Sequence, residues 1–188
     1  KYLTTYYGQL SHLKIYPNQK FALYNLVQVD KKVSEYFYKK KLVAIVHLLD
    51  ELNKEKYAKY ILRFLANENI NEGSEILAAK LATDISRFDF AIQISKIASY
   101  EKRFHHKYNY PIIGVPKNVK GRKIPDPAFI LSIIRQESEF DTSAHSSAGA
   151  KGLMQLMTYT ARTVAKQAKI SYSKKKLTKD PEYNINLG

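Results

Sequence analysis

Apolar residues recur at helical spacing through most of the first half of the chain, from about Phe21 to Tyr100. Polar or glycine-containing breaks interrupt this pattern at Leu52–Lys54, Asn67–Gly73 and Ser86–Arg87. Helical periodicity between such breaks predicts a series of amphipathic helices joined by short turns. We find no catalytic grouping of residue types within this stretch, so we interpret it as an all-α scaffold.

The scaffold contains two units of similar pattern. A shift of 33 residues pairs Leu48 with Leu81, Leu52 with Ile85, Tyr57 with Phe90, Ala58 with Ala91 and Ile61 with Ile94. Two helix–turn–helix units of this length are typical of a tetratricopeptide-like superhelix, in which each hairpin buries an apolar face on its neighbour. Ala58 and Ala91 are expected at close contacts between helices. The alternative is two amphipathic hairpins that are alike by chance.

Residues 104–126 differ in composition, and we interpret them as a linker between a scaffold at residues 1–103 and a second domain at residues 127–188. Prolines at positions 111, 116, 125 and 127 fit such a boundary. His105 and His106 are adjacent, and adjacent side chains diverge on any regular element, which makes them poor joint ligands for a metal. No cysteine or acidic cluster completes a metal site there.

The second domain opens with a predicted helix. Asp126-Pro127 has the pattern of an N-cap followed by a proline in the first turn. Glu137 falls within the apolar stripe of this helix, whereas Glu139 is rotated by about 200° and is expected to face water. Desolvation on an apolar face raises the pKa of a carboxyl group, so Glu137 could keep its proton and act as a general acid. The stripe comprises Phe129, Ile130, Ile133, Ile134 and Phe140. The alternative is that Glu137 pairs with a lysine or arginine.

A run of small residues follows, from Asp141 to Gly152, and it could bring backbone close to a ligand. It leads into Gly152–Met157, where the only two methionines of the chain flank Gln155. A soft thioether from Met154 and an amide beside a protonated acid would suit a sugar that carries N-acetyl groups. A core methionine and a surface glutamine are the alternative. Thr158 is expected to cap the next helix.

These residues resemble a known family. Glu137-Ser138, then Ser146, and then Gly149-Ala150 leading into Gly152–Gln155 are similar to the first two signature motifs of the soluble lytic transglycosylases, which have a lysozyme-like catalytic domain. Asn184–Gly188 is similar to the start of the third motif. Thr158 departs from the family pattern, in which proline is common. A later tyrosine-bearing motif of the family is absent from the sequence.

The resemblance implies a fold and a reaction. The fold class is all-α, with a helical-hairpin superhelix followed by a truncated lysozyme-like domain. The implied reaction cleaves the β-1,4 bond between N-acetylmuramic acid and N-acetylglucosamine in peptidoglycan and forms 1,6-anhydro ends. Glu137 would be the acid and then the base, and it needs no second carboxylate, metal or organic cofactor. The substrate-binding residues would be Ser138, Ser146, Gly152, Met154 and Gln155.

Composition limits the kinds of partner that the chain could bind, but it does not choose one of them. There are 31 Lys and Arg residues against 17 Asp and Glu residues, which gives a net charge of +14 and suits a polyanionic partner. The lysine runs are no longer than three, and we find neither a nucleic-acid motif nor a phosphate loop, so nucleic acid is not expected. Peptidoglycan carries carboxylates and qualifies as such a polyanion. No apolar run approaches the roughly 20 residues of a membrane span.

The start at Lys1, and an end within a predicted helix, suggest a fragment that has been cut on both sides and has no signal peptide. The resemblance implies a periplasmic location, and the absence of cysteine is compatible with it. Two other functions stay open. One is a muramidase-type hydrolase that uses water, and the other is a non-catalytic helical-repeat protein that binds protein partners.

Overall fold

The computed structural model describes residues 5–19, 28–69, 73–116, 118–119, 122–123 and 125–188. The start of the predicted helical pattern near Phe21 and parts of the predicted linker lie outside these ranges. The α-helices are α1 (Tyr6–Ile15), α2 (Lys31–Tyr38), α3 (Lys41–Glu51), α4 (Ala58–Glu68), α5 (Ser74–Asp84), α6 (Phe88–Tyr100), α7 (His106–Asn109), α8 (Pro127–Glu137), α9 (Thr158–Gln167) and α10 (Pro181–Leu187). Two short 3-10 helices are η1 (Glu55–Tyr57) and η3 (Lys176–Thr178).

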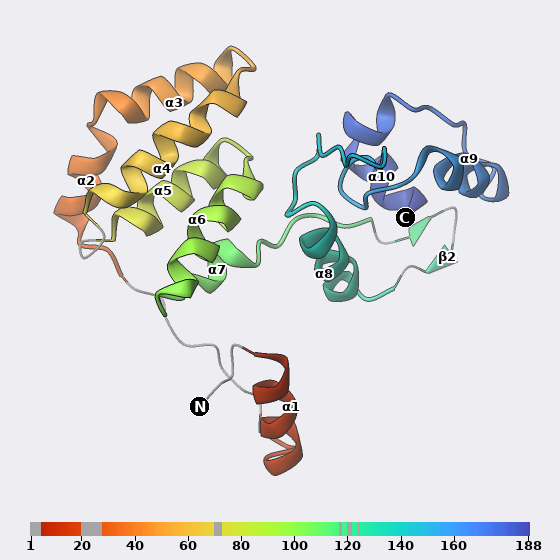
Figure 1. Ribbon diagram of the computed structural model, residues 1–188, viewed down its shortest axis with the longest axis horizontal. Helices are drawn as coiled ribbons and strands as arrows, with labels where there is room; N and C mark the ends of the chain where they lie inside the picture. The colour runs from red at the N-terminus through yellow and green to blue at the C-terminus, as the bar shows by residue number, and fades with distance from the viewer. Residues whose placement is uncertain (1–4, 20–27, 70–72, 117, 120–121, 124) are drawn as a thin grey trace.

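The predicted all-α class is confirmed. The only paired strands among the described residues are β1 (Asn118–Val119) and β2 (Arg122–Lys123), which form a two-residue antiparallel ladder within the predicted linker. Figure 1 shows α2 to α6 stacked on one side of the molecule and α8 to α10 on the other, with α1 set apart from both. None of the residues of α1 is buried. No helix in the described ranges is long and apolar enough to cross a membrane.

The two predicted hairpins are α3–α4 and α5–α6. Helices α3 and α5 have the same length, 11 residues, and begin 33 positions apart, at Lys41 and Ser74. Ala58 and Ala91 are both buried, as expected for residues at close helix contacts. The large residues paired by the 33-residue shift differ, however, in how exposed they are.

In the second hairpin Leu81, Ile85 and Phe90 are buried, while their counterparts Leu48, Leu52 and Tyr57 are more than half exposed. The first hairpin covers the second. Among the described residues nothing covers the first hairpin in the same way.

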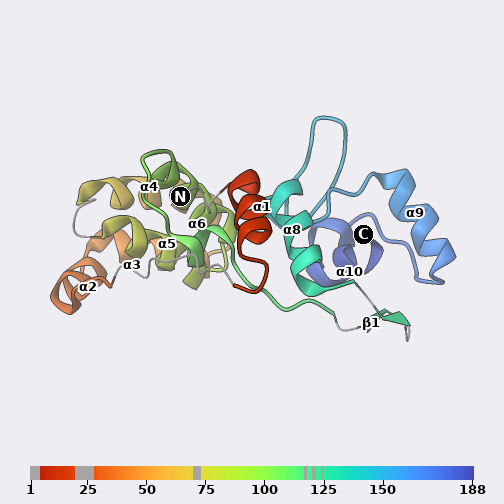
Figure 2. The ribbon, with the colours of Figure 1, turned by 90° about the horizontal axis from the view of Figure 1, so that it is seen from below.

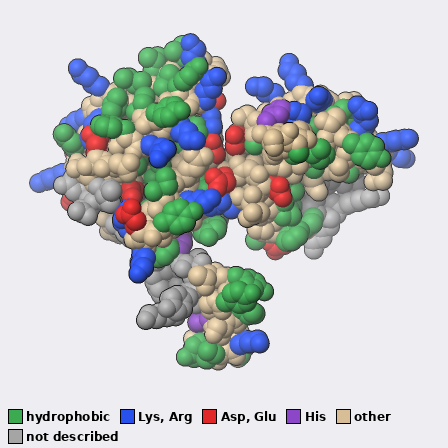
Figure 3. Space-filling model, in the orientation of Figure 1, with side chains coloured by type: hydrophobic (Ala, Val, Ile, Leu, Met, Phe, Trp, Pro, Cys, Tyr) green, Lys and Arg blue, Asp and Glu red, His purple; other side chains and the backbone are tan. Residues whose placement is uncertain are grey.

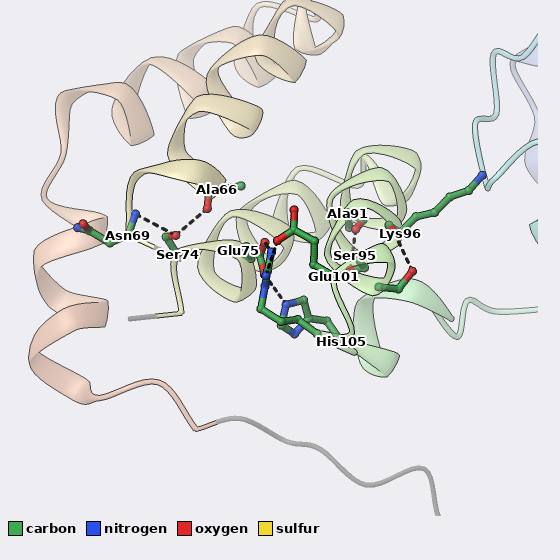
Figure 4. Close-up of polar contacts among 11 residues, drawn as sticks. Ala66, Asn69, Ser74, Glu75, Ala91, Ser95, Lys96, Glu101 and His105 are labelled. Atoms are coloured by element: carbon green, nitrogen blue, oxygen red, sulfur yellow. Dashed lines mark hydrogen bonds and ion pairs between the residues drawn. The ribbon is translucent and has the colours of Figure 1, made fainter. Parts of the chain in front are cut away.

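A buried acid joins α5 to the segment after α6. The carboxylate of Glu75 accepts hydrogen bonds from Arg103, with Nε 3.0 Å from Oε2 and Nη2 2.8 Å from Oε1. Nε2 of the buried His105 lies 2.9 Å from the same Oε2. Burial alone would raise the pKa of Glu75, but the hydrogen bonds from Arg103 and His105 outweigh it, and the pKa is lowered. Figure 4 shows Glu75 and His105 meeting between the helices. His105 therefore stabilises the packing of the scaffold.

The core crosses from the scaffold to the C-terminal part of the chain. Ile92 of α6 packs in one cluster with Ile130 and Ile134 of α8, and Phe140 and Leu153 also belong to it. A second cluster is confined to the C-terminal part and contains Leu156, Ala161, Ala165, Leu177, Tyr183 and Leu187. Figure 2 shows α8 and α10 next to each other, with α9 at the far end. The division into residues 1–103, 104–126 and 127–188 stays a prediction.

Candidate active site

Helix α8 begins as its sequence predicts. Oδ1 of Asp126 accepts a hydrogen bond from the backbone N–H of Ala128 at 2.7 Å, and Pro127 occupies the first turn. The helix buries Ile130 and Ile134 against the α6 cluster. Phe129, which the apolar stripe also included, is 58% exposed. The buried face of α8 is therefore narrower than the sequence pattern indicated.

Glu137 is the last residue of α8, and its side chain is exposed. Because the helix ends there, no further turn covers the carboxylate, and the expected burial on an apolar face is wrong. Within the described residues its carboxylate also makes no hydrogen bond or ion pair, so the alternative of a paired Glu137 finds no partner. The carboxylate is open to a ligand from solution.

Glu139 is the paired acid, which corrects the expectation that it faces water. Its carboxylate lies 2.9 Å from Nζ of Lys96 and 3.6 Å from Nη1 of Arg135, and the side chain is 25% exposed. The error arose because the helical rotation was extended past Glu137. Glu139 and Phe140 instead take left-handed backbone conformations, with φ of 51° and 67°. Such values are uncommon for bulky residues and often mark functional turns.

The segment after this turn is a tight loop that closes on itself. The backbone of Lys151 forms reciprocal hydrogen bonds with Leu156 at 3.1 and 3.0 Å, and the N–H of Gly152 donates to the carbonyl of Ala144 at 2.9 Å. Gly152 has φ of 70°, and a Cβ atom there would lie 2.0 Å from the carbonyl oxygen of Leu177. Only glycine fits this position without a shift of the backbone.

A buried asparagine from α10 holds the loop. Oδ1 of Asn184 accepts from the N–H of Met154 at 2.8 Å. Its Nδ2 donates to the carbonyls of Lys151 at 3.0 Å and Leu177 at 2.8 Å. The residue is 1% exposed. The sequence analysis placed Asn184 in the third motif but missed this role, which joins the second motif to the third across 30 positions.

The remaining predicted site residues are engaged within their own turns. Oγ of Ser138 donates to the carbonyl of Ile134 at 3.2 Å, and Oγ of Ser146 accepts from the N–H of Ala150 at 3.0 Å. Nε2 of Gln155 donates to the carbonyl of Gly152 at 2.8 Å. These contacts shape the loop, and contacts of the same residues with a ligand stay a prediction.

A cavity of about 210 Å³ lies between α8 and residues of the second and third motifs. Ile133, one turn before Glu137, forms its wall together with Met154, Asn186 and Gly188. The rest of the lining is Pro116, Pro125, Phe129, Ile130 and Ile185. Oδ1 of Asn186 is buried and has no hydrogen-bond partner among the described residues. Of the predicted site residues, Met154 lines this cavity, and Glu137 does not.

No metal site accompanies these residues. In the part of the chain that the structure describes, no three His, Cys, Asp or Glu side chains are grouped closely enough to hold a metal ion. The acids near Glu137 are held by other protein groups. Besides Glu139, Asp141 accepts hydrogen bonds at Oδ1 from the N–H and the hydroxyl of Ser143, at 2.9 and 2.7 Å.

Comparisons with known proteins agree with this arrangement of motifs. Residues 117–188 match the family described as the transglycosylase SLT domain. A Haemophilus influenzae protein assigned to the soluble lytic murein transglycosylases is 29% identical over 153 residues, which cover 79% of this chain and 25% of the relative.

Solved structures extend the likeness to the scaffold. The 70 kDa soluble lytic transglycosylase of Escherichia coli matches with a TM-score of 0.77 and 25% identity over 97% of this chain and 29% of that chain. An inactive mutant of the lytic transglycosylase Slt from Pseudomonas aeruginosa matches with a TM-score of 0.71 and 23% identity, over 96% of this chain and 29% of that one. The resemblance to soluble lytic transglycosylases is thereby confirmed. The chain spans about a quarter of the length of the relatives it matches.

Proposed function

We propose that this chain carries the acid-bearing part of a lytic transglycosylase site that cleaves the β-1,4 bond between N-acetylmuramic acid and N-acetylglucosamine in peptidoglycan. One observation carries the proposal: Glu137 presents an exposed carboxylate at the end of α8 that has no partner among the described residues. One turn earlier, Ile133 shares a cavity with Met154 of the loop that Asn184 holds. The SLT family match and the lytic murein transglycosylases among the relatives support the choice of substrate.

In the proposed reaction Glu137 acts twice. Its carboxyl group first gives a proton to the glycosidic oxygen, and the bond between that oxygen and C1 breaks. The acetamido group of the muramic acid stabilises the positive charge at C1. The 6-hydroxyl oxygen then bonds to C1 to close the 1,6-anhydro ring, and its proton passes to Glu137. The acid is regenerated, and no water is consumed.

Exposure of Glu137 in the free chain is compatible with this role. A glycan strand that covers Glu137 would exclude water from the place where the proton is transferred. Met154 and the adjoining cavity would provide apolar contact for the sugar, while Ser138, Ser146, Gly152 and Gln155 would shape the loop that meets it.

A single-acid reaction is favoured over hydrolysis by two carboxylates. An inverting or retaining hydrolase places a second free carboxylate about 5 to 9.5 Å from the first. Here the nearby acids are engaged, since Glu139 binds Lys96 and Asp141 binds Ser143. The products distinguish the two reactions, because hydrolysis adds one water to the mass and leaves a reducing end.

The experiment compares the full-length protein that contains this chain with its Glu137→Gln variant on purified sacculi, and mass spectrometry detects anhydromuropeptides. Glu182→Gln is the control, because Glu182 is also exposed but lies on α10. We expect loss of product for Glu137→Gln alone, with unchanged folding. Retention of most activity by Glu137→Gln would remove the assignment. The proposed substrate also places the protein in the periplasm, which cell fractionation tests.

A further inference from the structure

One short segment of the chain carries half of its net charge. Residues 158–179 contain seven cations and no Asp or Glu, a net charge of +7 within 22 of the 188 residues, whereas the whole chain has +14. The seven residues are Arg162, Lys166, Lys169, Lys174, Lys175, Lys176 and Lys179, and all of them are exposed. We call this set the basic face. Residues 102–125 likewise contain seven cations and no Asp or Glu, but several of them lie outside the described ranges. Residues 158–179 present such a set wholly within the part of the chain that the structure describes.

The basic face is held in place by its own side chains. Arg162 of α9 lies over the ring of Tyr172, 5.4 Å from its centroid, and so ties the helix to the segment that follows it. The hydroxyl of Tyr183 accepts from the N–H of Ser173 at 2.8 Å and donates to the carbonyl of Ser171 at 3.0 Å. These contacts hold the backbone that leads into Lys174–Lys176, so the cations are presented on an ordered support.

Few anions oppose these cations. Lys176 pairs with Asp180 at 3.3 Å, and the helix that packs on α9 and η3 adds only one other acid, Glu182. In the described ranges no ion pair is found for Arg162, Lys166 or Lys174. The same holds for Lys175 and Lys179. Figure 3 shows Lys and Arg side chains projecting from this end of the molecule, away from the scaffold. Cations within a Debye length of about 8–10 Å repel one another, and a bound polyanion relieves that repulsion.

We propose that the basic face binds carboxylates of the peptide stems on a peptidoglycan strand, and so holds the strand while its sugars lie at Glu137. This inference rests on the proposed function for its choice of polymer. Six of its seven cations are lysines, which act as point charges toward carboxylates and phosphates alike. The SLT match of this part of the chain favours the carboxylates of peptide stems, and duplex DNA is the competing ligand in the test.

The test removes four positive charges from the basic face and compares this variant with one that loses four positive charges from the scaffold. The face variant combines Lys166→Gln, Lys174→Gln, Lys175→Gln and Lys179→Gln. The control combines Lys32→Gln, Lys39→Gln, Lys41→Gln and Lys54→Gln, which are exposed lysines of the scaffold, so both proteins have the same net charge. Each is made in the Glu137→Gln background, so that the proposed cleavage does not disturb the measurement. Binding is followed by co-sedimentation with sacculi between low and high salt.

We expect the face variant to bind sacculi on the order of tenfold more weakly at low salt, since each exposed contact contributes modestly, and the control to change less than twofold. Sacculi whose carboxylates have been converted to neutral amides should lose the difference between the two variants. Equal weakening by both variants would overturn the proposal, because net charge alone would then explain binding. Undiminished binding of the face to amidated sacculi would overturn it as well. So would tighter face-dependent binding to duplex DNA than to sacculi.

The outcome is independent of the proposed function. Sedimentation reports binding whether or not any bond is cut, so the basic face can be confirmed even if Glu137→Gln leaves cleavage intact. Conversely, the proposed function can hold while the basic-face proposal fails. Anhydromuropeptide release would then require Glu137, and the face variant would bind sacculi no more weakly than the control. Circular dichroism of each variant confirms that the exposed substitutions leave the helices in place.

Discussion

Asn184 of α10 accepts a hydrogen bond from the backbone N–H of Met154 at 2.8 Å, and this contact ties two motifs that lie 30 positions apart in the sequence. The same amide donates to the carbonyls of Lys151 and Leu177. All polar atoms of a fully buried side chain are thus used to set the backbone of the loop beside Glu137.

Replacement of Asn184 by Leu keeps the approximate volume but removes three hydrogen bonds and leaves buried backbone groups unpaired. We expect a loss of about 3 kcal/mol in the free energy of unfolding. Met154 and Met157 are the only methionines, so methyl NMR resolves the loop directly, and the Met154 signal should shift or broaden. Asn186→Leu is the matched control, because the buried Oδ1 of Asn186 has no partner within the described ranges, and it should leave stability unchanged or raised. Equal effects of both substitutions would contradict the role of Asn184.

Gly152 makes the Asn184 contacts possible, and its substitution by alanine should be severe. A Cβ atom at position 152 would lie 2.0 Å from the carbonyl oxygen of Leu177 and 2.5 Å from Nδ2 of Asn184. Gly149 has a similarly positive φ of 90°, but a Cβ atom there would meet nothing within 4 Å. We therefore expect Gly149→Ala to cost about 1 kcal/mol through backbone strain alone. Gly152→Ala should cost on the order of 3 kcal/mol more, measured by chemical denaturation. Similar costs at both positions would show that the close approach at Gly152 is relieved by a small shift.

The sequence predicted the features of the site that depend on near neighbours. Asp126 caps α8 as expected, and Asp180 caps α10 by accepting from the N–H of Tyr183 at 2.9 Å. Thr158 was expected to cap α9, but the helix begins at Thr158 itself, and the cap residue Met157 makes no side-chain hydrogen bond. Cap positions can be misplaced by one residue because the sequence pattern alone does not fix the entry angle of the chain.

The features that sequence reasoning missed depend on contacts between distant residues or on a change of backbone direction. Helical rotation placed Glu139 in water, but the left-handed turn after Glu137 carries it to Lys96 of α6. The pairing of Glu75 with His105 spans 30 positions. Neither local propensity nor periodicity contains such information. Motif resemblance identified Asn184 as belonging to the third motif, but only the fold shows which backbone groups it reaches.

The buried Glu75 gives the scaffold a predictable response to acid. Its pKa in the folded chain is lowered from the ordinary value of 4.5, so the folded state favours the ionised carboxylate. The stabilisation is fully present above about pH 4.5 and is lost as the pH falls through the folded-state pKa. The thermal unfolding temperature of the wild type should therefore fall as the pH drops below 4.5. Glu75→Gln should flatten this part of the plot of unfolding temperature against pH.

At neutral pH we expect Glu75→Gln to cost about 3 kcal/mol, because Arg103 loses the counter-charge of a buried carboxylate and the contact with His105 is weakened. Glu101 binds the same arginine at 2.7 Å, but its side chain is 64% exposed. Glu101→Gln should therefore change stability by less than about 1 kcal/mol and leave the pH profile in place. A profile that Glu75→Gln leaves unchanged would place the acid sensitivity elsewhere.

Glu137 and Glu139 are two residues apart and should separate activity from stability. Glu137 is exposed and unpaired in the described part of the chain, so Glu137→Gln should change the free energy of unfolding by less than about 0.5 kcal/mol. It should also reduce anhydromuropeptide release at least about 100-fold, as expected for loss of a general acid. Glu139→Gln should do the reverse: it should lower stability by about 1 kcal/mol through loss of its contacts with Lys96 and Arg135, and it should keep most of the activity. Denaturation and product analysis on the same preparations check both halves. If Glu139→Gln abolished product and Glu137→Gln did not, the acid would have been assigned to the wrong residue of the pair.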